Sequence, residues 1–149
     1  MRAVVQRVLK AGVECDGSAV ASIDRGMLAL VGFHRDDTDA DSEYIAGKLL
    51  GLRIFDDAAG VMNLNLSEAG GGLLLVSQFT LYGDARKGRR PSYSEAMAPG
   101  PAREMFDRFT ARCRELHPVV ERGLFGAEMM VSLVNWGPVT ILLDSARLF

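Results

Sequence analysis

Short runs of apolar and β-branched residues alternate with polar turns along most of the chain. This pattern predicts strands at 3–14, 19–23, 27–33, 53–55, 73–76, 119–122, 129–134 and 139–143. Asp16-Gly17 lies between the first two strands, and this dipeptide favours the positive φ angles of a tight hairpin turn. The chain is therefore expected to be rich in sheet.

Two segments have helical spacing instead. A helix is expected at 40–50, and either Thr38 or Asp39 could serve as its N-cap. A second helix is expected at 102–116, where apolar residues recur every three or four positions before Pro118 ends it. Many strands, short turns and two helices predict an α+β fold with mostly antiparallel sheets that curl into a barrel-like core.

Length and composition indicate what kind of protein this is. The chain has 149 residues, 48% of them hydrophobic, which predicts one globular domain over 1–149. Cys15 and Cys113 match no metal-binding spacing, and nothing marks secretion, so we interpret them as reduced thiols of a cytoplasmic protein. No stretch is long enough to span a bilayer. We expect no metal and no cofactor.

The segment 73–91 combines features that a structural strand does not need. Its apolar start is followed by Ser77 and Gln78, which are expensive to bury without hydrogen-bond partners. Four cations follow at once: Arg86, Lys87, Arg89 and Arg90. The net charge is −2, so any contact with nucleic acid requires a local patch of this kind. The segment is either a strand end with a solvated basic loop or a site for an anionic substrate.

A second unusual segment, Asn135-Trp136-Gly137-Pro138, lies between two predicted strands. The simplest interpretation is an ordinary turn. However, a bond preceding proline adopts the cis form at a cost of only about 0.5–1 kcal/mol, and glycine lets main-chain groups approach a ligand closely. The segment could therefore contribute to a binding site.

Both segments resemble signature motifs of the D-aminoacyl-tRNA deacylases. The motifs are SQFTLYGD at 77–84 and NWGPVT at 135–140, and the opening MRAVVQRV resembles the first strand of that family. The resemblance implies a homodimer that hydrolyses the ester between a D-amino acid and the terminal adenosine of tRNA, and also removes glycine mischarged on alanine tRNA. Trp136 stands where the family often has a small acidic residue.

The resemblance also assigns roles to residues. Gly137 and Pro138 would form a cis dipeptide that reaches into the partner subunit's pocket and excludes L-amino acids. The pocket for the adenosine and the ester would be lined by Ser77, Gln78, Phe79 and Thr80. The basic loop would contact tRNA phosphates. Arg7 would brace the site by pairing with a carboxylate or carbonyls, unless it forms only an ordinary salt bridge.

The chemistry that these residues allow is restricted. Thr80 is the obvious nucleophile, but a hydroxyl needs an adjacent base, and we expect both histidines, His34 and His117, on the surface. Backbone N–H groups near Phe79 and Thr80 could instead form an oxyanion hole worth about 3 kcal/mol per donor. With Gln78, these residues are the catalytic candidates, and water attack assisted by the substrate's own ribose hydroxyl would complete the reaction. Two alternatives remain: a non-catalytic RNA-binding module and a small-ester hydrolase that uses Thr80.

Overall fold

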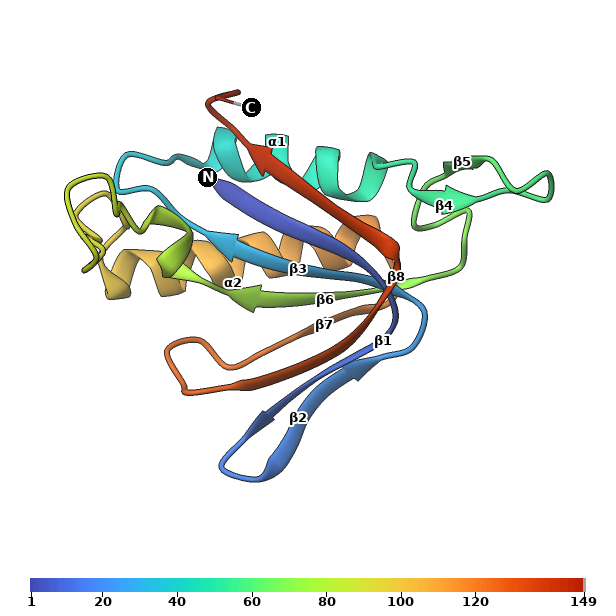
Figure 1. Ribbon diagram of the computed structural model, residues 1–149, viewed down its shortest axis with the longest axis horizontal. Coiled ribbons are helices and arrows are strands. Elements are labelled where there is room, and N and C mark those ends of the chain that lie inside the picture. The colour runs from blue at the N-terminus through green and yellow to red at the C-terminus, as the bar shows by residue number, and fades with distance from the viewer. Residues whose placement is uncertain (149) are drawn as a thin grey trace.

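The structure is a computed structural model that describes residues 1–148, and it combines one curled sheet with two helices (Figure 1). The helices are α1 (Asp39–Gly51) and α2 (Pro99–Leu116), and a short 3₁₀ turn, η1, spans Phe79–Tyr82. The strands are β1 (Arg2–Cys15), β2 (Ser18–Ile23), β3 (Gly26–Gly32), β4 (Phe55–Asp56), β5 (Met62–Leu64), β6 (Gly72–Ser77), β7 (Val120–Arg122) and β8 (Met130–Asp144). The predicted α+β class is confirmed.

The long strand β1 organises the sheet. Its first half pairs with β3 and its second half with β2, while β8 runs along its other edge. These pairs are antiparallel, as predicted, but β3–β6 and β6–β7 are parallel, so the sheet is mixed. The strand order is β2-β1-β3-β6-β7, and β2 at one end also packs against β6 and β7 at the other. This contact nearly closes the sheet into the expected barrel-like core.

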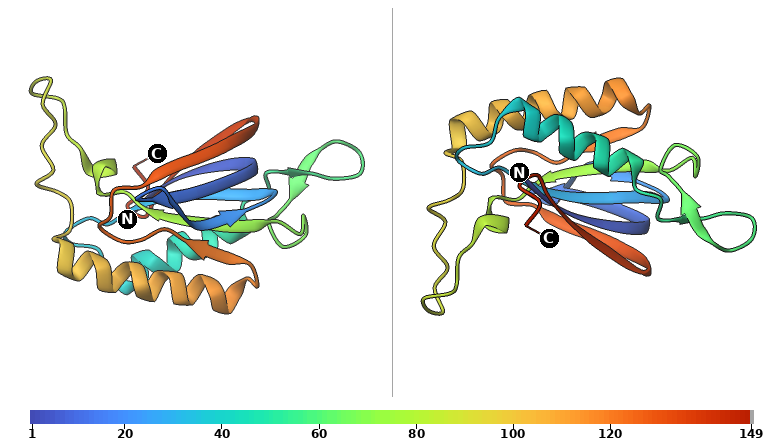
Figure 2. Two further views of the ribbon diagram at one scale, coloured as in Figure 1. Left: turned by 90° about the horizontal axis from the view of Figure 1, so that it is seen from below. Right: turned by 90° about the horizontal axis from the view of Figure 1, so that it is seen from above.

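Alternate residues of β3 and β6 face two different cores, because successive side chains of a strand point to opposite faces. Met27 and Leu73 lie in the larger core, which packs against α1 and α2. Leu28 and Leu74 lie in the smaller core under the β1–β2 hairpin. Both helices lie on the same side of the sheet (Figure 2). Strand β6 is therefore covered on both faces, and its C-terminal end is held rigidly.

Several predicted boundaries change. Helix α2 begins at Pro99, three residues before the predicted start, because proline is well suited to the first helical position. The predicted strands 129–134 and 139–143 are one continuous strand, β8, with residues 136–139 bulging out between the pairs Val8↔Asn135 and Gln6↔Thr140. The side-chain amide of Asn135 closes this bulge, since it accepts from the N–H of Val139 at 2.8 Å and donates to its carbonyl at 3.1 Å.

The surface location predicted for His117 is wrong. Only 3% of this residue is exposed, at the junction between α2 and β7. Its Nε2 donates to the carbonyl of Gly71 at 2.8 Å, and its Nδ1 accepts from the hydroxyl of Ser67 at 3.1 Å. The histidine thus ties the glycine-rich connector before β6 to the end of α2. His34 is partly exposed, at 26% of its side chain.

Candidate substrate pocket

The first motif of the sequence borders a cavity of about 690 Å³. Ser77, Gln78 and Phe79 form one wall, where β6 ends and η1 begins. The opposite walls come from the loop before α2 and from the segment between β7 and β8, which contribute Tyr93, Met97, Phe125 and Met129. The cavity is large enough for a nucleoside-sized ligand.

The local sequence explains how this wall forms. Strand β6 is apolar as far as Val76, and its parallel pairing with β3 ends at Val31↔Ser77. The N–H of Gln78 still donates to the carbonyl of Val31 at 2.7 Å, after which the chain turns into η1. Phe79 is 57% exposed, and its ring meets that of Tyr93 edge-on at 5.1 Å between centroids. The cavity mouth therefore carries an exposed aromatic pair.

Thr80 has no base beside it in the described part of the chain. Its hydroxyl oxygen accepts a hydrogen bond from Gln78 Nε2 at 2.5 Å, and the residue is exposed outside the cavity wall. Both ring nitrogens of His117 are bonded elsewhere. His34 is engaged too, because its Nε2 donates to Glu95 at 3.0 Å and its Nδ1 accepts from the N–H of Asp36 at 3.2 Å. The hydroxyl of Thr80 is not activated in this arrangement.

The backbone at the start of η1 offers hydrogen-bond donors. Within the described residues, the N–H groups of Phe79 and Thr80 donate to no acceptor. Such free donors are normal for the first turn of a helix, where no preceding carbonyl is in position. Phe79 borders the cavity, so at least its end of the turn can present a donor to a bound carbonyl oxygen.

The four predicted phosphate-binding cations lie on a loop that projects from the body of the molecule (Figure 2). Two backbone hydrogen bonds between Asp84 and Ser92, of 2.8 and 2.9 Å, close the base of the loop. Arg86 is paired with Asp84 at 2.7 Å, and this contact lowers the pKa of the Asp84 carboxyl to about 2. The other three cations, Lys87, Arg89 and Arg90, are exposed and form no ion pair with a described residue.

Gly137 and Pro138 lie away from the cavity of their own chain. Both are exposed on the bulge of β8, and neither borders the cavity. The peptide bond between them is cis, as predicted from the sequence. Within the described chain, Ser77, Gln78 and Phe79 of the first motif border the cavity, whereas Thr80, Gly137 and Pro138 do not.

Arg7 braces the bulge from below, and the predicted pairing with carbonyls and a carboxylate is confirmed. It is 4% exposed and donates to the carbonyls of Trp136 at 2.8 Å and Ile54 at 2.7 Å, and to Asp56 at 3.3 Å. The centre of the Trp136 ring also lies 4.4 Å from the guanidinium carbon of Arg7 and 4.7 Å from that of Arg25. Both distances lie in the range of cation–π contacts, so each arginine is held against the ring.

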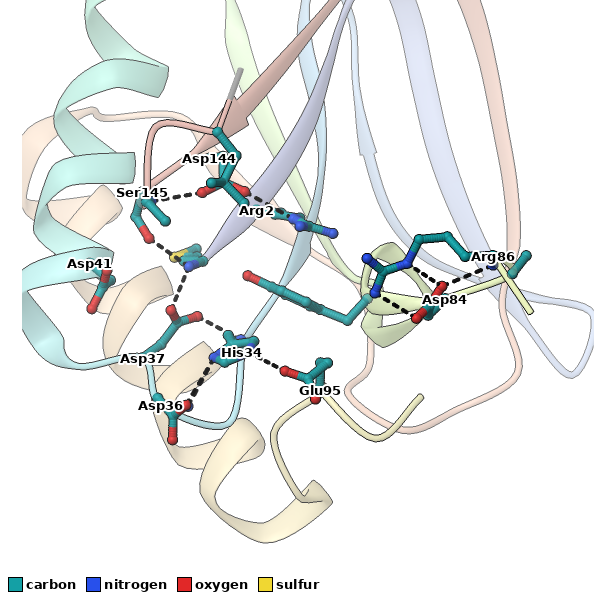
Figure 3. Close-up of a pocket in the computed structure, with 16 residues that line it drawn as sticks. Arg2, His34, Asp36, Asp37, Asp41, Asp84, Arg86, Glu95, Asp144 and Ser145 are labelled. Carbon is teal, nitrogen blue, oxygen red and sulfur yellow. Dashed lines mark hydrogen bonds and ion pairs between the residues drawn. The ribbon is translucent and has the colours of Figure 1, made fainter. Parts of the chain in front are cut away.

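A larger cavity of about 860 Å³ is lined in part by Tyr82, the last residue of η1 (Figure 3). Its walls are rich in charge, but its carboxylates already have partners: Asp144 binds Arg2, Asp84 binds Arg86 and Glu95 binds His34. The hydrogen bond from His34 is the main factor that lowers the pKa of Glu95. We therefore consider the smaller cavity, which holds the motif residues, to be the candidate substrate site.

Sequence reasoning missed much of the pocket wall. Tyr93 and Met97 fall in the irregular stretch before α2, and Phe125 falls in a loop. One sequence signal for this wall was available: Tyr93, an aromatic residue in a polar stretch shortly after Pro91. Between residues 1 and 148 no cluster of three or more His, Cys, Asp or Glu side chains could hold a metal ion. Nor does any helix there have the length and apolar character needed to cross a membrane.

The fold belongs to a class of α+β proteins with a mixed, nearly closed sheet and two helices. A solved structure entitled "c-Myc DNA Unwinding Element Binding Protein" superposes with a TM-score of 0.93 at 36% identity, over 97% of this chain and 98% of that one. A probable eukaryotic D-amino acid tRNA deacylase, at 22% identity, shares the fold with a TM-score of 0.82 over 96% of this chain and 98% of its own.

Sequence comparison specifies the family. The model of the D-Tyr-tRNA(Tyr) deacylase family matches residues 4–144, and the chain belongs to this family. It is 57% identical to a D-aminoacyl-tRNA deacylase of Kosmotoga olearia and 54% identical to one of Thermosipho africanus, in both cases over 100% of each chain. Both relatives are named D-aminoacyl-tRNA deacylase, so the resemblance inferred from the two motifs is confirmed.

Proposed function

We propose that this protein hydrolyses the ester bond of D-aminoacyl-tRNA and releases free tRNA and the D-amino acid. The observation that carries the proposal is that Ser77, Gln78 and Phe79 line one cavity, whose wall also includes Tyr93, just after the basic loop. A terminal adenosine with its ester fits such a cavity, and the preceding phosphates would lie against the loop. Glycine attached to alanine tRNA is a further proposed substrate.

The proposed reaction uses positioning rather than a protein nucleophile. The free N–H groups of Phe79 and Thr80 would stabilise the oxyanion that forms when water attacks the ester, at about 3 kcal/mol for each donor. Gln78 would orient the ester through its side-chain amide. The vicinal ribose hydroxyl of the substrate would assist the water, because Thr80 lacks a base. This division of roles favours the deacylase over a small-ester hydrolase that depends on Thr80.

The proposed selectivity requires a second copy of the chain. The outer face of β8 exposes Met130, Val134 and Leu142 to 72%, 41% and 55%, an apolar surface that suits an interface between copies. Gly137 and Pro138 are exposed on the same strand, outside their own cavity. In the homodimer that we propose, they enter the partner's pocket, contact the α-amino group of the substrate and exclude L-amino acids. Arg7 would support this dipeptide from below rather than touch the substrate.

Loss of the dimer provides a test of this arrangement. Leu142→Glu should yield a monomer in analytical ultracentrifugation and abolish deacylation, because each pocket then lacks its partner's dipeptide. Val61→Glu is the matched control, since Val61 is 58% exposed on the separate β4–β5 hairpin. A fully active Leu142→Glu monomer would refute the shared site.

The decisive experiment compares D-tyrosyl-tRNA with L-tyrosyl-tRNA and with D-tyrosine ethyl ester. A deacylase of the proposed kind hydrolyses the first and leaves the second intact. A non-catalytic RNA-binding module would bind both tRNAs and cleave neither. A small-ester hydrolase would cleave the ethyl ester as rapidly as the tRNA ester. A substrate of this kind also implies that the protein acts in the cytoplasm.

A further inference from the structure

We infer that Arg2 is a positioning residue that holds η1 in the conformation needed for deacylation, an inference that rests on the proposed function. Arg2 does not border the substrate cavity. Instead, it lines the charged cavity of Figure 3. Its influence on the substrate would therefore be exerted through the turn alone.

The contacts of Arg2 join the end of η1 to the sheet. Its Nη1 donates to the carbonyl of Leu81 at 3.0 Å, and its Nε donates to Asp144 Oδ2 at 2.9 Å. Asp144 is itself fixed, because its side chain is only 3% exposed and its Oδ1 accepts from the N–H of Ala146 at 2.7 Å. Arg2 and Asp144 face each other across the β1–β8 ladder, so the guanidinium has a rigid base (Figure 3).

Tyr82, the last residue of η1, is held by the same group. The guanidinium of Arg2 lies 4.6 Å from the centre of its ring, and the ring of His34 lies 5.3 Å away in a tilted arrangement. Tyr82 is 7% exposed, and its hydroxyl has no hydrogen-bond partner among the described residues. Its position is therefore set by these ring contacts and by the packing around it.

Arg2 adds a hydrogen bond from outside η1 to the backbone hydrogen bonds of the turn itself. The N–H of Leu81 reaches the carbonyl of Gln78 at 3.3 Å, and that of Gly83 reaches the carbonyl of Thr80 at 2.9 Å. Bonds in 3₁₀ turns have poorer geometry than those in α-helices. In the described chain, the carbonyl of Leu81 accepts a hydrogen bond from Arg2. Without the guanidinium, this carbonyl would have only water as a hydrogen-bond partner. Phe79, which lies in the turn just after the Gln78–Val31 hydrogen bond, would then lose its fixed placement in the cavity wall.

The test compares Arg2→Gln, Arg2→Lys and Asp144→Asn with the control Arg108→Gln. Arg108 also forms an ion pair, with Asp39 at 3.0 Å, but on the exposed surface between the helices. Arg2→Gln should lower kcat by about tenfold, equal to about 1.4 kcal/mol, with KM for D-tyrosyl-tRNA within about twofold of wild type. Arg2→Lys should be intermediate, because one ammonium cannot reproduce a planar fork of donors. Asp144→Asn should also lower kcat, and Arg108→Gln should not change it.

Hydrogen exchange gives a readout that does not depend on activity. In Arg2→Gln, the amide of Gly83 should exchange at least about tenfold faster, while amides of β1 and β3 keep their wild-type protection. Wild-type exchange at Gly83 together with wild-type kcat would overturn the inference, as would a loss of protection spread evenly over the sheet. If the Gln variant does not fold, Arg2→Lys decides the question by the same two measurements. A wild-type protein without deacylase activity would refute only the proposed function, because the exchange at Gly83 still reports whether Arg2 holds the turn.

Discussion

Replacing Arg89 and Arg90 by alanine should weaken tRNA binding and reduce its dependence on salt. Both side chains are exposed on the loop that projects beyond Asp84 and Ser92, and neither forms an ion pair in the described structure. Their charge is therefore available to phosphates. Arg86 differs, since Asp84 already neutralises it, and its replacement should have a smaller effect.

The size of the effect follows from counterion release. Each phosphate contact adds about 0.7–0.9 to the slope of log K against log salt, so the double variant should lose about 1.4–1.8 from the slope. Between about 50 and about 200 mM salt, the wild type should then lose about 7- to 12-fold more affinity than the variant. The rate at saturating substrate should stay the same, because the loop lies outside the cavity.

Fluorescence anisotropy of labelled tRNA across this salt range measures the slope directly. Arg108→Ala with Arg112→Ala is a charge-matched control, since these two arginines pair with acidic residues on the helices and carry the same total charge. The control should keep the wild-type slope. Equal slopes for the loop variant and the wild type would remove the loop from the tRNA contact.

Three further outcomes follow from the contacts within the chain. Thr80→Ala should keep kcat within about tenfold of wild type, because its hydroxyl has no base to activate it, and a covalent aminoacyl adduct on Thr80 would contradict this reasoning. His117→Ala should lower the free energy of unfolding by about 1–3 kcal/mol in urea titrations, because the buried carbonyl of Gly71 loses its donor. Burial raises the pKa of the Cys113 thiol to about 12, so at pH 8 a thiol reagent should label Cys15 alone in the folded protein and both cysteines in denaturant.

The sequence predicts the elements well where one physical signal dominates. β1, β3 and β6 are continuous apolar or alternating runs, and their positions agree with the prediction to within one residue at each end. Thr38 caps α1 as expected, with its side chain and that of Asp41 forming a capping box. The wall formed by Ser77 to Phe79 also follows from the sequence, because polar residues directly after a buried strand need a polar destination.

Other features depend on long-range packing that a local pattern does not encode. Gly137 and Pro138 predict a turn, yet the pairing of β8 with β1 on both sides converts the segment into a bulge within one strand. His117 precedes a proline at a helix end, which suggests exposure, but it is buried against the connector before β6. Tyr93 reaches the pocket from a loop whose course is set by the Asp84–Ser92 contact and by α2.

Unpaired cations of the described chain lie on the basic loop, whereas the pocket wall carries mainly uncharged groups. A net charge of −2 gives no general attraction for tRNA, so long-range attraction has to come from the few cations that no carboxylate neutralises. Lys87, Arg89 and Arg90 are such cations, and they lie on the loop rather than in the pocket. The pocket wall itself carries an amide, a hydroxyl and an aromatic ring, which can orient an ester but attract it weakly from a distance. Changes in the loop should therefore act on affinity, and changes that loosen η1, such as those at Arg2, should act on the rate of the chemical step.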